Sequence, residues 1–197
     1  AYHIGMHKKI KKSIQQLKLC SFKKIDSCSV NDIPFVNVSG IGFDAHIGNL
    51  FAKKKSRGFI NYVKLIIREL SYKSNNYVIK YNGEIRKVDA FLIAFANASQ
   101  YGNNAHISPL ANICDNQLDF VIIKNFPKWK IPLIFYMLTH KKIHLSRHVE
   151  IIQTNKMTIE TKNSLVHLDG EPNKLKTPIT IQLHPRSLTI FSPYEKS

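Results

Sequence analysis

The feature that most constrains the fold of this chain is a series of short, β-prone apolar segments separated by turn residues. From Val149 onward these segments follow one another closely, as VEIIQT, KMTIET, SLVHL, ITIQL and LTIF. Two earlier β-rich runs flank Asn82 and Gly83, a pair favoured by the two-residue type I′ hairpin turn. Closely spaced short strands with turns between them are typical of a β-sandwich.

Helical patterns are few and far apart. Apolar residues recur at helical spacing in the basic segment 6–18 and in the segment 57–70. A third helix is expected in 127–143, with Pro132 in its first turn or at a kink. Because repeated βαβ units need a helix between successive strands, the sequence predicts a mainly β (α+β) fold, a two-sheet β-sandwich with a few peripheral helices.

Composition narrows the classes of partner. The 197 residues have a formal net charge of +16, with 29 Lys and Arg against 13 Asp and Glu. Such a charge attracts anions, which include nucleic acids, anionic lipid headgroups and phosphorylated small molecules. With 44% hydrophobic residues the chain can bury a sizeable core.

Cysteine usage and hydropathy indicate the compartment. The three cysteines, Cys20, Cys28 and Cys114, form no C-x-x-C pair, which argues against a disulfide framework and a zinc site. No apolar run approaches the roughly 20 residues that span a bilayer. We therefore expect a cytoplasmic protein whose membrane contact, if any, is peripheral.

Residues 40–45, Gly-Ile-Gly-Phe-Asp-Ala, follow an expected strand and match the dinucleotide-binding form G-x-G-x-x-[G/A]. A nucleotide site also needs a helix that opens at the third small residue and a later acidic group at a strand end. Here Gly48 is expected to interrupt the helix, and Glu69 lies within a helical pattern. The interpretation we favour is that Gly40 and Gly42 serve a tight turn and close packing.

Two further segments contain carboxylates that allow a structural or a functional interpretation. Asp115 precedes the apolar run LDFVII, where it can begin an Asx turn or offer oxygen to a hard cation such as Mg²⁺. Asp169 and Glu171 end another apolar run and flank Gly170, where they can form a hairpin turn whose loop Pro172 and Asn173 continue, or contribute to an active site. The basic run AKKKSR, residues 52–57, is either a solvated loop or a contact for phosphates.

Taken together and in this order, NVSGIGFDAHI, YGNNAHISPLANICDNQLD and HLDGEP resemble the C-terminal domain of the diacylglycerol kinase and sphingosine kinase family of lipid kinases. The likeness extends from about Ile4 to the C-terminus. Family members have an α/β domain, whose G-G-D-G-T loop holds ATP, and a β-sandwich domain that completes the site. No two adjacent glycines occur in this sequence, so that loop is not in it.

The resemblance implies a domain organisation. Residues 1–25 would form a helix that links to the N-terminal ATP-binding domain, and residues 26–197 the C-terminal β-sandwich domain. The last strand would be placed to pack back on that N-terminal domain.

The resemblance also implies roles for individual residues. Glu171, or as second choice Asp169, would be the base that accepts the proton of the lipid hydroxyl. Gly40, Gly42 and Asp44 would shape the lipid-binding side of the cleft. Mg²⁺ would be held by Asp115 with main-chain oxygens of Asn112 and Gln117, although the family usually has Gly where this chain has Asn116.

The resemblance implies that the chain is the C-terminal half of an ATP-dependent kinase that phosphorylates a lipid hydroxyl, with diacylglycerol as the expected substrate and phosphatidic acid as product. Mg²⁺ is the expected cofactor and ATP the co-substrate, bound mainly by the N-terminal domain. The expected location is the inner membrane surface, with an anionic membrane as partner, and a homodimer is left open. The alternative from another class is a basic nucleic-acid-binding module, which the charge alone would support but for which no reading motif is present.

Overall fold

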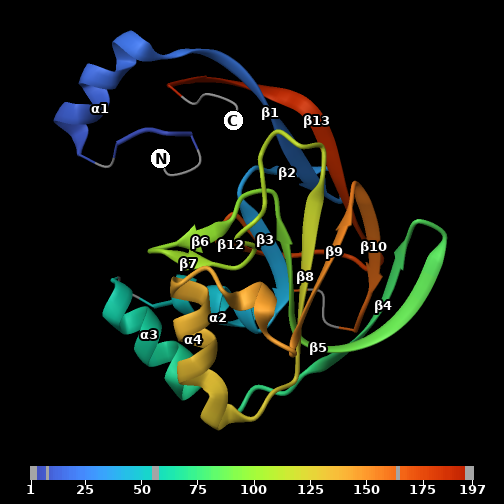
Figure 1. Cartoon of the computed structure of the whole chain (residues 1–197). Helices are drawn as coiled ribbons and strands as arrows, with labels where there is room; N and C mark the ends of the chain where they lie inside the picture. The colour runs from blue at the N-terminus through green and yellow to red at the C-terminus, as the bar shows by residue number, and fades with distance from the viewer. Residues whose placement is uncertain (1–3, 8, 55–57, 163–164, 194–197) are drawn as a thin grey trace.

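The computed structural model describes residues 4–7, 9–54, 58–162 and 165–193, and Figure 1 shows its arrangement. The helical elements are α1 Ile10–Gln16, η1 Leu17–Leu19, α2 Phe43–Ala52, α3 Phe59–Arg68, η2 Lys128–Lys130, α4 Ile131–Thr139 and η3 Ile143–Leu145. The strands are β1 Ser21–Val30, β2 Ile33–Phe35, β3 Val38–Gly42, β4 Asn75–Tyr81, β5 Glu84–Ala96, β6 Gln100–Gly102, β7 Ala105–His106, β8 Leu118–Lys124, β9 Val149–Thr154, β10 Lys156–Glu160, β11 Leu165–Leu168, β12 Glu171–Lys174 and β13 Ile179–Ser192.

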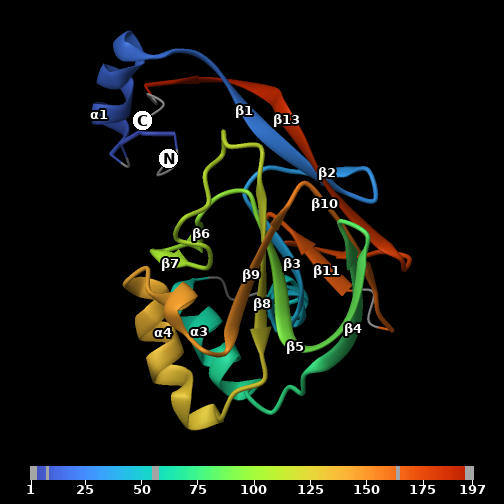
Figure 2. The same cartoon turned by 45° about the vertical axis from the view of Figure 1, so that its right-hand side comes forward.

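Among the described residues, eleven strands form one curled antiparallel sheet in the order β12-β11-β3-β5-β4-β10-β13-β1-β2, with β8 pairing with β5 and β9. A small second sheet contains only β6 and β7. Strand β5 is the branch point, because its first half pairs with β4 and its second half pairs with β3 on one side and β8 on the other. The sheet therefore folds over on itself, as Figure 2 shows, and the predicted β-sandwich-like fold is confirmed.

The apolar runs of β5 and β8 supply two cores because successive side chains of a strand point to opposite faces. Ile93 and Phe95 of β5 pack inside the folded sheet, with Phe120 of β8. Leu92 and Ala94, which alternate with them, face a second core under the helices. Burial on both faces explains why the second half of β5 and most of β8 are apolar instead of alternating with polar residues.

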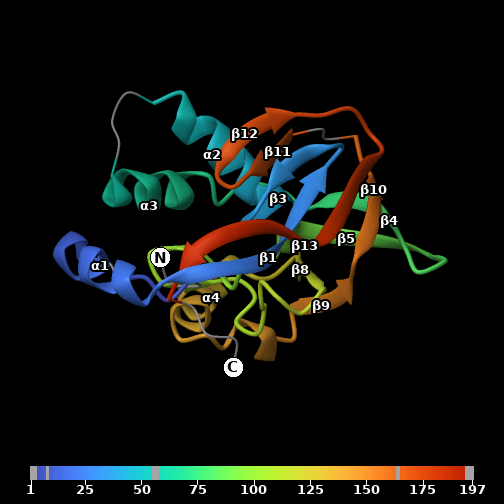
Figure 3. The ribbon, with the colours of Figure 1, turned by 90° about the horizontal axis from the view of Figure 1, so that it is seen from above.

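The helices α2, α3 and α4 gather on the outer face of this part of the sheet (Figures 1 and 2). Seen from above, β1 and β13 form a long ribbon that extends from the body, and α1 lies beyond its outer end (Figure 3). Within the described residues, no helix is both long enough and apolar enough to cross a bilayer.

Several local predictions are confirmed. Asn82 and Gly83 join β4 to β5 with φ of 49° and 82°, as a type I′ turn requires. Pro132 lies in the first turn of α4, where a missing N–H costs no helical hydrogen bond. Helices also form in the two earlier segments with helical periodicity, as α1 and α3.

Four expectations were wrong. Gly48 does not interrupt a helix, since α2 runs through it to Ala52. Pro172 and Asn173 do not continue a loop but belong to β12, which pairs with β11. The segments ITIQL and LTIF are parts of one strand, β13, because it stays paired with β1 across a register shift near Asp26. Strand β1 begins at Ser21, so residues 21–25, expected in the linking segment, already pair with β13.

Candidate functional site

The motif of residues 40–45 lies where β3 ends and α2 begins. Gly42 has φ of +99°, and a Cβ there would lie 2.6 Å from the carbonyl oxygen of Phe91. A Cβ on Gly40 would lie 2.5 Å from Oδ2 of Asp44 and 2.9 Å from the carbonyl oxygen of Ile93. The two glycines thus allow β3 to pack closely on β5 and leave room for the Asp44 carboxylate.

A nucleotide cradle does not fit this motif. Strand β3 pairs antiparallel with both β5 and β11, whereas the dinucleotide-binding motif belongs to a parallel βαβ unit. The interpretation favoured from the sequence, close packing, agrees with this geometry.

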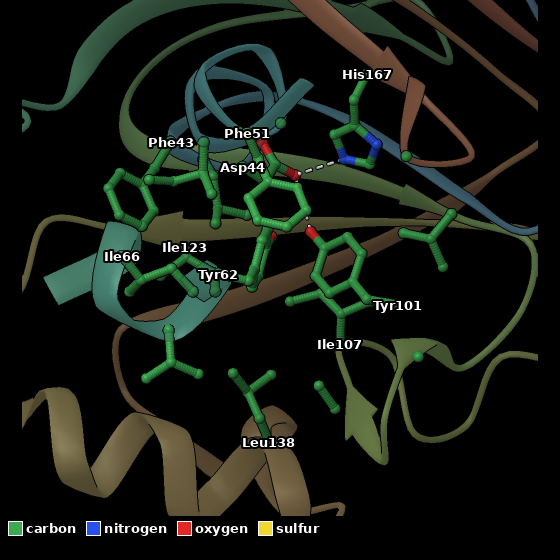
Figure 4. A pocket seen from close by; sticks show the side chains of 18 of the residues that line it. Phe43, Asp44, Phe51, Tyr62, Ile66, Tyr101, Ile107, Ile123, Leu138 and His167 are labelled. Atoms are coloured by element: carbon green, nitrogen blue, oxygen red, sulfur yellow. Dashed lines mark hydrogen bonds and ion pairs between the residues drawn. The ribbon is translucent and has the colours of Figure 1, made fainter. Parts of the chain in front are cut away.

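Asp44 lies in the first turn of α2, where the helix dipole favours a negative charge. Its Oδ2 accepts a hydrogen bond from the Tyr101 hydroxyl at 2.8 Å and one from Nε2 of His167 at 3.0 Å. Its Oδ1 accepts the N–H of Ala45 at 2.8 Å. Segments distant in the sequence thus converge on one carboxylate, as Figure 4 shows.

The Asp44 carboxylate affects the neighbouring tyrosines. Burial, and then the charge of Asp44, raises the pKa of Tyr101 well above its ordinary value. The same two causes raise the pKa of Tyr62 to about 12. Both phenols therefore stay protonated at neutral pH, and Tyr101 remains a hydrogen-bond donor to Asp44.

This polar cluster lines a cavity of about 620 Å³. The walls are otherwise mostly apolar and come from α2, α3, α4 and the sheet, for example Phe51, Ile66, Ile123 and Leu138 (Figure 4). Such a volume is in the range of about 300–1,000 Å³ that holds a single small ligand. Among the described residues that line the cavity, the acidic ones are Asp44, Asp169 and Glu171.

Asp169 and Gly170 form the two-residue turn between β11 and β12, with φ of 49° and 94°. The carboxylate of Asp169 accepts the N–H groups of Val36 and Asn37, each at 2.8 Å. Both of its oxygens thus hold the connection between β2 and β3. Asp169 therefore both forms the hairpin turn and lines the cavity, so the structural and the functional interpretation of this segment are compatible.

Glu171 is the first residue of β12 and is exposed at the cavity. No hydrogen bond or ion pair holds its side chain within the part of the chain that the structure describes. Of the two carboxylates in this segment, Glu171 is thus the one whose oxygens are free to accept a proton from a ligand.

The predicted metal loop lies apart from this cavity, whose described lining includes none of residues 112–117. Oδ1 of Asp115 accepts the N–H of Gln117 at 3.0 Å, and Oδ1 of Asn112 accepts the N–H of Cys114 at 3.1 Å. Asn116 has φ of 60°, so it adopts the left-handed conformation for which the family uses Gly. The Asx turn expected from the sequence is present.

Asp115 is the carboxylate that this loop could offer to a hard cation. Burial raises the pKa of Asp115, and the nearby carboxylates of Asp119 and Asp26 add to the effect. The two oxygens of Asp26 already accept the N–H groups of Asn116 and Arg186, at 2.9 and 2.7 Å. Within the described ranges, no group of three His, Cys, Asp or Glu side chains could hold a metal ion, so a cation here would depend on main-chain oxygens.

The sequence did not identify Tyr101 and His167 as site residues. Each lies within a quoted motif, YGNNAHISP and HLDGEP, but nothing local indicates that its side chain reaches Asp44. The pairing of β11 with β3 places His167 opposite Gly40 and so brings its side chain to Asp44.

Of the basic run 52–57, residues 55–57 lie outside the described residues.

Comparison with known proteins gives a consistent result. A family model for the YegS C-terminal NAD kinase β-sandwich-like domain matches residues 37–192. A protein of Chromohalobacter salexigens named "Probable lipid kinase YegS-like" is 25% identical over 154 residues, which cover 76% of this chain and 50% of that protein. The chain thus spans about half the length of this curated relative.

Solved structures share the fold. A crystal structure of a diacylglycerol kinase from Bacillus anthracis superposes with a TM-score of 0.69 at 19% identity, covering 97% of this chain and 61% of that one. A second structure from the same organism gives a TM-score of 0.73 at 18% identity, covering 97% and 63%. At these identities the likeness establishes the fold.

Proposed function

Because this chain belongs to the family of YegS C-terminal NAD kinase β-sandwich-like domains, we propose that it is the lipid-binding half of an ATP-dependent lipid kinase. The reaction is transfer of the γ-phosphate of ATP to the hydroxyl of diacylglycerol, which gives phosphatidic acid. ATP is bound mainly by an N-terminal domain, to which the α1 segment leads and against which the end of β13 packs. The enzyme acts at the cytoplasmic surface of the membrane.

One observation carries this proposal: an apolar cavity of about 620 Å³ has carboxylates in its wall. An acyl chain is stabilised by burial among apolar side chains, at about 0.8 kcal/mol for each CH₂ group. A glycerol hydroxyl needs a polar partner, which Asp44 or Glu171 can supply. A single-stranded nucleic acid would instead be held by a basic groove with aromatic side chains on which bases stack.

Glu171 is the proposed base. A carboxylate within hydrogen-bond reach of the lipid hydroxyl accepts its proton as the oxygen attacks the γ-phosphate. Asp169 is the second candidate, although its oxygens are occupied by Val36 and Asn37. Asp44, held by Tyr101 and His167, would orient the polar end of the lipid.

Mg²⁺ is proposed at the loop of Asp115, with main-chain oxygens of Asn112 and Gln117. Bound there, the ion would offset the negative charge of Asp115 and its acidic neighbours. Since this loop does not line the cavity, its proposed effect is on the stability of the domain.

The test is a lipid phosphorylation assay on the protein together with its ATP-binding domain, with labelled ATP and diacylglycerol in mixed micelles. We expect labelled phosphatidic acid as product. Monoacylglycerol and sphingosine, tested in parallel, measure substrate preference. Label transfer to one of these and not to diacylglycerol would contradict the substrate, and transfer to no lipid would contradict the activity.

A further inference from the structure

Helices α3 and α4 present apolar side chains on their outer surfaces as well as to the cavity between them. On α3, Val63 and Ile66 line the cavity, whereas Ile60 and Ile67 are 70% and 60% exposed. Trp129, in the short η2 helix before α4, is 76% exposed. A contiguous patch of exposed apolar side chains indicates an interaction surface, whereas single ones do not.

The cavity reaches the outer surface at α4. Phe135 lines the cavity and is nevertheless 52% exposed, and Lys128 is likewise both exposed and part of the lining. At Phe135, the exposed apolar surface of α4 is therefore continuous with the apolar wall of the cavity.

Basic residues outnumber acidic ones along these helices, although Glu69, which follows α3, pairs with Arg68 and His46. Residues 45–68 and residues 120–149 contain no Asp or Glu, and each segment contains six Lys or Arg. The exposed cations include Lys64 and Arg68 on α3 and Lys128 beside Trp129. Lys130 lies 5.3 Å from the centre of the Trp129 ring.

Basic side chains among exposed aromatic and aliphatic ones are what a surface needs to lie on an anionic bilayer. Tryptophan favours the depth of the headgroups, where its ring is in an apolar environment and its N–H can still meet a polar partner. Lysine and arginine are attracted to anionic headgroups, and their stems contact the apolar region. In this chain, the apolar and the basic side chains both come from residues 45–68 and 120–149.

We propose that a docking face, defined by Ile60, Lys64, Ile67, Lys128, Trp129 and Phe135, lies on an anionic bilayer and admits the lipid between α3 and α4. The inference rests on the proposed function in that the cavity ligand is a membrane lipid. Docking itself needs neither ATP nor catalysis. Figure 1 shows α3 and α4 at the lower left and the β4–β5 hairpin at the right.

The only tryptophan of the chain, Trp129, is on this face, so its intrinsic fluorescence reports docking without a label. The probe is vesicles of equal parts phosphatidylcholine and phosphatidylglycerol, with vesicles of phosphatidylcholine alone for comparison. We expect cosedimentation and a blue shift of the emission with the anionic vesicles, both weakening as salt rises, because exposed charges are screened. Brominated acyl chains should quench the emission.

Matched variants test the residues. Ile60→Ser and Lys64→Glu should each weaken vesicle binding by about tenfold or more. Ile85→Ser, at a residue that is 67% exposed on the β4–β5 hairpin, and Lys87→Glu on the same hairpin should bind as the wild type. Circular dichroism confirms that each variant is folded, and a variant that is not is replaced by Ile67→Ser or Lys128→Glu.

Other outcomes overturn the proposal. Cosedimentation without a change in Trp129 emission places the membrane contact on another face. The Trp129 emission could already be blue-shifted without vesicles, and the protein could be a dimer that Ile60→Ser dissociates. These two results together would assign the face to a second copy of the chain. Binding to RNA or DNA but not to anionic vesicles assigns it to nucleic acid. If docking occurs as expected but no lipid is phosphorylated, the docking face stands and the proposed function fails.

Discussion

Oδ2 of Asp44 and Nε2 of His167 lie 3.0 Å apart, although 123 positions separate the two residues in the sequence. Because a carboxylate only accepts, the imidazole donates its Nε2 proton, and Tyr101 donates a second hydrogen bond to the same oxygen. Two donors therefore hold Asp44 in one orientation at the wall of an apolar cavity. A carboxylate held in this way can present its charge to a ligand without first reorganising.

Tyr101→Phe tests whether the hydrogen bond from the Tyr101 hydroxyl to Asp44 stabilises the domain. The substitution removes a hydrogen bond to a charged group, which contributes about 1.5–3 kcal/mol to stability. We expect the free energy of unfolding, measured by urea denaturation, to fall by about that amount. Tyr136→Phe, on the exposed side of α4, is the matched control and should change stability by much less. Equal effects of the two substitutions would show that Asp44 does not depend on Tyr101.

Glu171→Gln and Asp169→Asn separate the two candidate bases. With the ATP-binding domain present, Glu171→Gln should lower kcat for lipid phosphorylation by roughly 10²-fold or more, with an unchanged melting temperature. Asp169→Asn should lower the melting temperature, because its amide group cannot accept both the Val36 and the Asn37 N–H groups, which leaves one unpaired at a cost of about 1–3 kcal/mol. A folded Glu171→Gln enzyme with activity within a few fold of wild type would exclude Glu171 as the base.

Glycine substitutions test the junction between β3 and α2. Gly48→Ala should stabilise the domain by about 0.5–1 kcal/mol, because Gly48 is within α2 and an added Cβ meets neighbours only at 3.9 Å. Gly42→Ala should destabilise it strongly, since the Cβ would lie 2.6 Å from the Phe91 oxygen at φ of +99°. In thermal unfolding, the melting temperature should rise for Gly48→Ala and fall for Gly42→Ala. A loss of stability in Gly48→Ala would mean that α2 is interrupted after all.

Magnesium and pH should act on the stability of the domain through Asp115. Burial raises the pKa of this carboxyl in the folded chain, so folding favours its protonated form. Without Mg²⁺, the wild type should therefore lose stability relative to Asp115→Asn as pH rises through the range in which the carboxyl titrates. At neutral pH, Mg²⁺ should raise the melting temperature of the wild type and hardly that of Asp115→Asn. Equal shifts of the melting temperature in the two proteins would show that Mg²⁺ does not bind at Asp115.

The sequence predicted those features that local chemistry determines. Most of the strands, the Asn82-Gly83 turn and the helices α3 and α4 follow from residue spacing and turn preference. Gly48 was misinterpreted because a glycine weakens a helix by only about 1 kcal/mol, which packing of the Ile47 side chain in the core under the helices can offset. His167 and Tyr101 could not be assigned, since their approach to Asp44 depends on strand pairing between distant segments. The resemblance to lipid kinases located the motifs, and the pairing of the strands determines which side chains meet.

The last prediction concerns nucleotide binding by the 197-residue chain alone, which we expect to bind ATP weakly and to transfer no phosphate. A triphosphate is held by a run of backbone N–H groups at a helix N-terminus, with glycines that allow close approach. The glycine motif at α2 cannot provide this, because Gly40 and Gly42 face the backbone of β5 and the Asp44 carboxylate lies in the first turn. A base without a positioned phosphate gives little catalysis, since positioning supplies most of the acceleration in phosphoryl transfer. Calorimetric titration with Mg-ATP measures the affinity, and a dissociation constant in the low micromolar range would place the nucleotide site in this half of the enzyme.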